Sequence, residues 1–265
     1  WILHAVHPYA GDIYFASGYQ ADRVKKLYPS FIYHENDNWE STGSGWSFVN
    51  SLPRNSTSCL VTYGDILYRS SIIDKIMAEQ SDVVVIIDSH WKQRYAGRTL
   101  FDLKRCEKAC ILDGLVTKLG AQISIDTITS EFIGLVRLSR NACEFLKELI
   151  KSVDIDVIKE FALSDIIELL RIRGMEVRSV DVCGDWAELR QEADLARFIL
   201  GTKAQTLSRL RPMLKKSYIE SQVVFRTEEW RINSEGITCK IRKKFGSRKV
   251  VVRSSHANED GFGDS

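Results

Sequence analysis

The chain has 265 residues, and 44% of them are hydrophobic, which is enough for one large domain or for one domain and part of another. Its 37 Lys and Arg residues nearly balance 35 Asp and Glu residues, which argues against a nucleic-acid-binding protein that relies on a basic surface. No apolar run approaches the roughly 20 residues of a transmembrane helix, so we expect no membrane partner.

The first half of the chain alternates strand and helix patterns. Strands are expected at 12–17, 31–36, 59–65 and 82–89, with helices at 20–28, at 44–52 and around Ile72, Ile73 and Ile76. The run at 82–89 is almost purely β-branched, as in a strand that is covered on both faces. This alternation predicts an α/β fold with a mainly parallel sheet layered by helices.

The second half is less regular at first. Residues 92–128 are expected to form short strands and turns, followed by a strand at 131–139, helices at 140–153 and 162–174, a strand at 176–185 and a helix at 189–201. Ser164 is the expected N-cap of the helix at 162–174, and Gly174 its C-terminal stop. After Gly201 the chain is basic, with few long apolar runs before "KVVVRSS".

The six cysteines are scattered and form no C-x-x-C pair, and the C-x-x-x-C at Cys106 and Cys110 has no histidine nearby. We therefore expect the reduced thiols of a cytoplasmic protein rather than a metal site. The five histidines also lack metal-ligand spacing. The chain begins at Trp1 and shows no signal-peptide pattern, and we expect it to be part of something longer.

The strand at 59–65 ends in Gly64-Asp65. Ligands of open α/β sheets bind beyond the carboxyl ends of the strands, and Gly lets the backbone approach a ligand closely. An Asp at that place can hold Mg²⁺, which takes one or two carboxylates together with phosphate oxygens. An ordinary strand-to-helix turn accounts for the same pair of residues.

Five segments between residues 12 and 198 carry a resemblance. They are "IYFASGYQADRVKKL", "YHENDNWESTGSGWSFVNSL", "LVTYGDILY", "EFIGLVRLS" and "VDVCGDWAELRQEADLARF". In order and spacing they resemble the nucleotidyltransferases, specifically the branch with phosphocholine and phosphonate cytidylyltransferases. The resemblance assigns residues 1–199 to a nucleotidyltransferase domain with a Rossmann-like fold.

This resemblance implies a reaction in which a phosphate or phosphonate oxygen attacks the α-phosphorus of an NTP, expected to be CTP, and pyrophosphate leaves with the help of Mg²⁺. It implies Asp65 as the first metal ligand, Glu188 near the second metal position and Glu131 facing the acceptor. It assigns nucleotide or acceptor contacts to Asn38, Thr42 and Ser47. A solvated carboxylate at a helix start is the alternative for Glu188. Phosphocholine, an aminoalkyl phosphonate and a sugar phosphate all remain open as acceptors.

The sequence departs from this family in two places. The family opens with a Gly- and Arg-rich loop and a Pro-Lys pair that grip the triphosphate. The expectation is that this chain lacks that loop and is inactive by itself, so that nucleotidyl transfer is an activity of its parent protein. Relatives also carry an Asp two residues after the terminal Glu, where this chain has Arg190. Either another carboxylate such as Asp185 takes that role, or the site is weakened, or Arg190 binds phosphate directly.

A second resemblance begins at residue 200. "LGTKAQTLSRL" and "KVVVRSSHANED" resemble the start of the ATP-grasp nucleotide-binding domain of phosphoenolpyruvate synthase and pyruvate phosphate dikinase. It implies ATP as a partner of 200–265, with Lys203 and Arg253 binding phosphate, because guanidinium offers bidentate donors. An ordinary surface Arg at a strand edge is the alternative for Arg253. His256 is expected to be a polar loop residue rather than a phosphorylated histidine.

Two other classes of function compete with nucleotidyl transfer. A nucleotide-sugar glycosyltransferase would carry an Asp-x-Asp metal motif after the strand, but Asp65 is followed by Ile66 and Leu67. A non-catalytic nucleotide-binding or regulatory module is favoured by Arg190 and by the missing loop.

Overall fold

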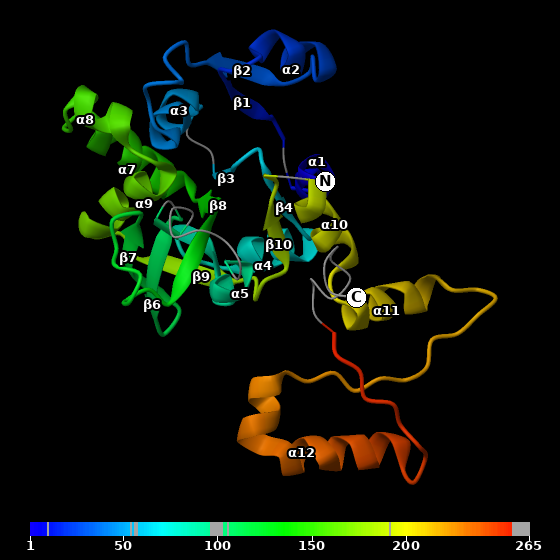
Figure 1. Cartoon of the computed structure of the whole chain (residues 1–265). Coiled ribbons are helices and arrows are strands. Elements are labelled where there is room, and N and C mark those ends of the chain that lie inside the picture. The colour runs from blue at the N-terminus through cyan, green and yellow to red at the C-terminus, as the bar shows by residue number, and fades with distance from the viewer. Residues whose placement is uncertain are drawn as a thin grey trace. The chain divides into compact units, whose positions relative to one another are not determined.

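The computed structural model describes residues 1–9, 11–53, 55, 58–95, 103–104, 106–190 and 192–255. The chain divides into two compact units, Trp1–Leu189 and Arg190–Ser265. Figure 1 shows the strands in the first unit and long helices in the second. This division falls ahead of the junction expected at residues 199 and 200, so the helix before Gly201 belongs to the second unit.

A six-stranded sheet forms the centre of the first unit. Its order is β3-β8-β5-β9-β7-β6, and β8 also pairs with β6. The strands are β3 Cys59–Thr62, β5 Val83–Asp88, β6 Lys108–Leu112, β7 Leu115–Gly120, β8 Ser130–Leu138 and β9 Val177–Asp181. The predicted α/β class, with helices layered on a sheet, is confirmed.

The strand directions are more mixed than the sequence predicted. Among the described pairings of this sheet, β5–β9 is parallel, whereas β8 runs antiparallel to both β3 and β5. The register places Asp88, the end of β5, opposite Glu131 near the start of β8. The chain thus re-enters the sheet at the edge where β5 left it. Among the described residues between β5 and β8, no helical crossover returns the chain to the other edge, and β8 runs antiparallel to β5.

Strand β5 shows why the sequence predicted a buried strand. All six of its residues are buried. Val83, Val85 and Ile87 pack into one hydrophobic cluster, and Val84 and Ile86 pack into another on the opposite face. Since alternate side chains of a strand point to opposite faces, an apolar layer covers each face of the sheet, as expected.

Two short ladders lie outside the central sheet. Strand β1 (Tyr14–Ser17) pairs in parallel with β2 (Ile32–Glu35), and β4 (Ile66–Tyr68) pairs antiparallel with β10 (Trp186–Glu188). The sequence missed β4 and β10 because each is only three residues long. The expected strand at 59–65 therefore ends at Thr62, and Gly64-Asp65 turns into β4 rather than directly into a helix.

Helices cover both faces of the central sheet. Those of the first unit are α1 Ile2–Val6, α2 Ala21–Leu27, α3 Ser44–Ser51, α4 Ser70–Ala78, α5 Trp91–Arg94, α7 Arg140–Ile150, α8 Ile155–Glu160 and α9 Leu163–Ile172. Side chains of α3, α7 and α9 pack on one face, and those of α1 and α4 pack on the other. No described helix is long and apolar enough to cross a bilayer.

The start of α9 corrects the expected cap at Ser164. The N-cap position is Ala162, whose N–H donates to the Asp165 carboxylate at 2.8 Å. The Asp165 carboxylate thus satisfies one of the free backbone N–H groups at the start of the helix. A serine side chain was expected to provide such a cap. Ser164 lies inside the first turn and is fully buried.

Helix α3 is held at its start by backbone contacts with the α8–α9 connection. The N–H of Gly43 donates to Lys159 O at 2.7 Å, and the N–H of Gly45 donates to Phe161 O at 2.8 Å. In addition, Leu163 N donates to the Ser44 hydroxyl at 3.0 Å. The N-cap residue Gly43 and the first two residues of α3, Ser44 and Gly45, are thereby fixed to one neighbouring segment.

The second unit is helical in its described part. It contains α10 Glu192–Leu200, α11 Lys203–Leu210, a 3₁₀ turn at Arg211–Met213 and α12 Thr227–Phe245. The strand expected at "VVVRSS" is wrong: residues 250–255 form no strand, and Val251 and Val252 are 85% and 81% exposed. The described part of this unit has no other strand to pair with it, and an isolated strand leaves its backbone groups without ladder partners.

We expect trypsin to cut this chain first at Lys215 or Lys216. Both are exposed and lie in 214–226, which has no helix or strand, and proteases cleave where local backbone hydrogen bonding is weakest. Mass spectrometry of a digestion time course should show the fragment ending at one of these residues first. A first cut at Arg137, which lies in β8 and donates to three carbonyl oxygens, would contradict the expectation.

Candidate functional site

Polar residues gather at one edge of the central sheet. Strands β3 and β5 both run antiparallel to β8, and β9 runs parallel to β5, so β3, β5 and β9 end at the same edge. Asp65 follows β3, Asp88 ends β5, Asp181 ends β9, and Glu131 lies at the start of β8. This edge is where α/β sheets of this kind bind ligands.

Asp65 and Glu188, the two expected metal ligands, lie at the same end of the β4–β10 ladder. Asp65 is exposed in the turn before β4. The register pairs Glu188 with Ile66, and Leu189 N donates to Asp65 O at 2.7 Å. Two carboxylates suit a Mg²⁺ ion that completes its shell with phosphate oxygens and water. The described residues contain no group of three or more His, Cys, Asp or Glu that could hold a metal by themselves.

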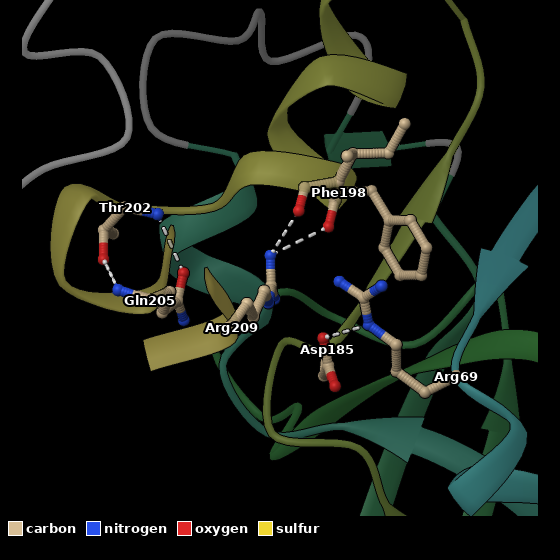
Figure 2. A network of polar contacts seen from close by, with 7 residues as sticks. Arg69, Asp185, Phe198, Thr202, Gln205 and Arg209 are labelled. Atoms are coloured by element: carbon tan, nitrogen blue, oxygen red, sulfur yellow. Dashed lines mark hydrogen bonds and ion pairs between the residues drawn. The ribbon is translucent and has the colours of Figure 1, made fainter. Parts of the chain in front are cut away.

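Asp185 does not replace the carboxylate that is expected at Arg190. Its Oδ1 accepts from Arg69 Nε at 3.2 Å, as Figure 2 shows. Trp186 pairs with Tyr68, so Asp185 lies at the opposite end of the β4–β10 ladder from Asp65. At about 3.3 Å per residue, four steps separate the two ends by roughly 13 Å. The backbone N–H of Arg190, in the second unit, donates to Asp194 at 3.1 Å.

Asn38, Thr42 and Ser47 are brought together by Asn36, a buried residue that sequence reasoning missed. The Asn36 amide nitrogen donates to the hydroxyl oxygens of Thr42 at 2.8 Å and Ser47 at 3.1 Å. Its amide oxygen accepts from Asn38 N at 3.2 Å, and the Thr42 hydroxyl donates to Asn38 O at 2.9 Å. The structure thus gathers these three expected contact residues at the end of β2, with Asn38 exposed and the other two half-buried.

Glu131 is only 3% exposed. It lies opposite Asp88 on one side and Lys108 on the other, and both are buried as well. Glu131 Oε1 accepts from the Tyr95 hydroxyl at 2.6 Å, while the Lys108 ammonium donates to the carbonyl oxygens of Lys104, Cys106 and Ala121. Buried ionisable groups are stable only with such hydrogen-bond partners. Glu131 and Lys108 are therefore held in place at the edge of the sheet.

Asp88 is a site candidate that sequence reasoning missed. Its carboxylate accepts from Trp186 Nε1 at 2.9 Å and from His90 N at 2.8 Å, which joins the end of β5 to β10. The signal was present, because Asp88 closes an apolar strand just as Asp65 follows one. The Trp186 contact could not be foreseen, since the two residues are 98 positions apart.

Tyr63 fixes the backbone just before Gly64-Asp65. Its hydroxyl donates to Glu107 Oε2 at 2.8 Å and lies 3.1 Å from the Ser44 hydroxyl, and its N–H donates to Gly134 O at 3.0 Å. Burial raises the pKa of Tyr63, and the Glu107 charge raises it further. Burial also raises the pKa of Glu107 above its usual range, although hydrogen bonds from Ser164 and Tyr63 act in the opposite direction.

The raised pKa of Glu107 predicts a pH-dependent stability difference. The folded protein keeps a proton that the unfolded chain releases, so this stabilisation is complete at low pH and is lost as the pH rises from about 4.5 through the folded pKa. Glu107→Gln stays neutral, so its free energy of unfolding should improve relative to wild type across that window. Urea unfolding at a series of pH values measures this, with the exposed Glu144→Gln as control. A Glu107→Gln difference that stays constant with pH would contradict the assignment.

In the second unit, helix capping accounts for the residues around Gly201. Gly201 has a φ of +68° between α10 and α11. Thr202 and Gln205 form a capping box at the start of α11, and Arg209 Nη1 donates to the last carbonyl oxygens of α10, Phe198 O and Ile199 O (Figure 2).

One contact joins the two segments of the second resemblance. Ala204 N, next to Lys203, donates to the Ser255 hydroxyl oxygen at 2.9 Å, two residues after Arg253. Lys203 is half-buried, whereas Arg253 is exposed. Phosphate binding by these two side chains stays a prediction.

Comparison with known proteins identifies the fold of the chain. No protein-family model matches the sequence, and no curated protein matches it either. The structure is similar to the inositol-1-phosphate CTP transferase from T. maritima, with a TM-score of 0.52 and 19% identity over 67% of this chain and 69% of that one. It is also similar to a protein from Bacillus anthracis described as a glucose-1-phosphate thymidylyltransferase, solved with sucrose, with a TM-score of 0.57 and 14% identity over 77% of this chain and 80% of that one. The chain therefore has the fold of nucleotidyltransferases.

Proposed function

We propose that this chain carries the catalytic site of a cytoplasmic, Mg²⁺-dependent nucleotidyltransferase that moves CMP from CTP to a phosphate or phosphonate acceptor. The observation that supports it best is the position of Asp65 and Glu188, which lie together at one end of the β4–β10 ladder. Asp65 follows the carboxyl end of β3, and the fold is that of proteins named as transferases of CTP and of sugar 1-phosphates.

In this proposal Asp65 and Glu188 hold the metal. Bound Mg²⁺ would neutralise charge on the triphosphate while pyrophosphate leaves. Ser47, oriented by Asn36, would donate its hydroxyl to a nucleotide or acceptor oxygen, and Thr42, whose hydroxyl proton goes to Asn38 O, would contact the same ligand through its oxygen. Catalysis of this kind consists mostly of positioning and charge stabilisation, so it needs no nucleophile from the protein.

The acceptor is proposed to lie beside Glu131. At this edge Asp65, Asp88, Glu131 and Asp181 outnumber the buried Lys108, which makes the edge acidic. Such an edge favours an acceptor that carries an amine or quaternary ammonium group in addition to its phosphate or phosphonate. Phosphocholine and 2-aminoethylphosphonate have that chemistry, whereas a sugar phosphate has not.

We also propose that residues 200–265 begin an ATP-binding phosphotransferase module of the phosphoenolpyruvate synthase type in the parent protein. The support is the hydrogen bond between Ala204 N and Ser255, which brings the segments of Lys203 and Arg253 together. ATP binding to the parent, lost in Lys203→Ala and Arg253→Ala but kept in Arg248→Ala, tests this proposal.

Pyrophosphate release by the parent protein tests the transferase proposal. CTP, UTP, ATP and GTP are each offered with Mg²⁺ and with phosphocholine, 2-aminoethylphosphonate or a sugar 1-phosphate. We expect release from CTP with a cationic acceptor, loss with EDTA and strong reduction in Glu188→Gln. Nucleotide binding without release from any pair would favour the non-catalytic module, and sugar transfer from a nucleotide sugar would favour the glycosyltransferase.

A further inference from the structure

Cys59 and Cys143 are distant in sequence, but their sulfur atoms lie 3.4 Å apart. Cys59 begins β3, an edge strand of the central sheet, and Cys143 lies in α7. Both are free thiols; Cys59 is half-buried and Cys143 is 2% exposed. A disulfide bond is about 2.05 Å long, so the two sulfur atoms need to approach by only about 1.4 Å to bond.

The surroundings of Cys143 favour its thiolate. Lys147 follows it by four residues on the same face of α7, and the Lys147 ammonium donates to Pro53 O at 2.5 Å. Cys143 also lies near the N-terminus of α7, where the helix dipole favours an anion. A hydrogen bond from the Cys59 thiol and the charge of Lys147 both lower the pKa of Cys143, and the same hydrogen bond raises the pKa of Cys59.

The other four cysteines lack this arrangement in the described part of the chain. Cys106 donates to Leu103 O at 3.1 Å, and Cys110 donates to Thr127 O at 3.4 Å. Cys183 and Cys239 are exposed. The contact between Cys59 and Cys143 therefore singles out one pair for oxidation, and the remaining cysteines serve as internal controls.

We propose that Cys59 and Cys143 form a modification site at which a peroxide converts two thiols into a disulfide that links β3 to α7. The Cys143 thiolate attacks one oxygen of hydrogen peroxide, the O–O bond breaks, and Cys143 becomes a sulfenic acid while hydroxide leaves. The Cys59 sulfur then attacks the sulfenic sulfur, and the S–S bond forms as the second oxygen leaves as water. Two thiols lose two electrons in total, and one peroxide is reduced to two waters.

Peroxide is the oxidant class that suits this burial. Its molecules are close to water in size and can reach a sulfur that is almost fully covered. A larger disulfide such as oxidised glutathione would have to approach Cys59, whose thiol is the weaker nucleophile because its contact with Cys143 raises its pKa. The proposal therefore predicts faster oxidation by hydrogen peroxide than by glutathione disulfide at equal concentration.

Peptide mapping tests the proposal directly. The purified chain is treated with hydrogen peroxide, its remaining thiols are alkylated, and it is digested with trypsin. Cys59 falls in the tryptic peptide 55–69 and Cys143 in the peptide 141–147, and each contains a single cysteine. We expect these two peptides to appear as one disulfide-linked species that dithiothreitol separates. Cys59→Ser and Cys143→Ser should abolish it, and Cys110→Ser should retain it.

Thermal unfolding supplies a second readout. A bridge that closes so long a loop restricts the unfolded chain, so the oxidised protein should unfold at least about 4 °C higher than the reduced one. Cys59→Ser should show no such shift in unfolding temperature. If Cys143→Ser fails to fold, Cys59→Ser alone provides the comparison. Oxidation of the exposed Cys183 and Cys239 without the 55–69 and 141–147 linkage would overturn the proposal. So would linkage of Cys59 to a different cysteine.

Discussion

Asp65→Asn in the parent protein should reduce nucleotidyl transfer by at least about a hundredfold while leaving the fold intact. Asparagine keeps the size of the side chain but removes the charge that a Mg²⁺ ligand needs. Losing a metal that stabilises the transition state by several kcal/mol costs a factor of ten for each ~1.4 kcal/mol. Because Asp65 lies exposed in the turn between β3 and β4, its free energy of unfolding should change by less than about 0.5 kcal/mol.

Asp185→Asn is the matched control for this experiment. It also removes one exposed carboxylate from the β4–β10 ladder, but at the end where Arg69 is its partner. We expect turnover within about threefold of wild type, because a half-exposed ion pair contributes at most about 1 kcal/mol. Steady-state pyrophosphate release at several Mg²⁺ concentrations separates the two variants. Equal losses in both, or full activity in Asp65→Asn, would remove Asp65 from the metal site.

Gly134→Ala should destabilise the protein by about 2–5 kcal/mol and lower its melting temperature by roughly 5–15 °C. Gly134 has a φ of +82°, which strains any residue with a β-carbon. A β-carbon there would also lie 2.1 Å from Cδ2 of the Tyr63 ring. Tyr63 cannot move away easily, because its hydroxyl is held by Glu107 and Ser44. The clash should therefore also disturb the Gly64-Asp65 turn.

Gly114→Ala separates strain from the clash. Gly114 has a similar φ of +78°, but a β-carbon there would meet no atom within 4 Å. This variant should lose only the strain energy, about 1–2 kcal/mol. Calorimetry on both variants gives the difference, which is the cost of displacing Tyr63. If the two variants lose the same stability, the Tyr63 ring does not pack on Gly134 as described.

The sequence predicted the fold class because the signal for it is local. The β-branched run of β5 and the amphipathic helices α4, α7 and α9 depend on spacing within one segment, and each lies close to where it was expected. The direction of a strand within its sheet is not determined by the local sequence. Nothing in β8 itself indicates that the chain enters the sheet at the edge where Asp88 ends β5, so the sheet was expected to be more parallel than it is.

The residues of the candidate site also fall into those that a local sequence pattern marks and those that it does not. Asp65 could be found because a strand that ends in an acidic turn is visible in the sequence, and the same pattern would have found Asp88. The roles of Asn36, Glu107 and Trp186 depend on partners that the fold brings from distant segments, so no local pattern marks them. The "VVVRSS" strand was predicted wrongly for the opposite reason: its local pattern was clear, but the described part of the second unit offers it no neighbouring strand.

The backbone contacts of α3 also set limits on how this protein can change during evolution or in the laboratory. A β-carbon at Gly43 would lie 2.1 Å from Phe161 O, and one at Gly45 would lie 2.5 Å from Ala162 O. Backbone atoms cannot rotate aside as side chains do, so both positions tolerate only glycine unless α3 shifts. If Thr42 and Ser47 contact the substrate as proposed, new substrate preferences should therefore arise through replacements at these two positions while α3 stays in place. A selection library for altered specificity gains most by randomising those two positions and leaving both glycines untouched.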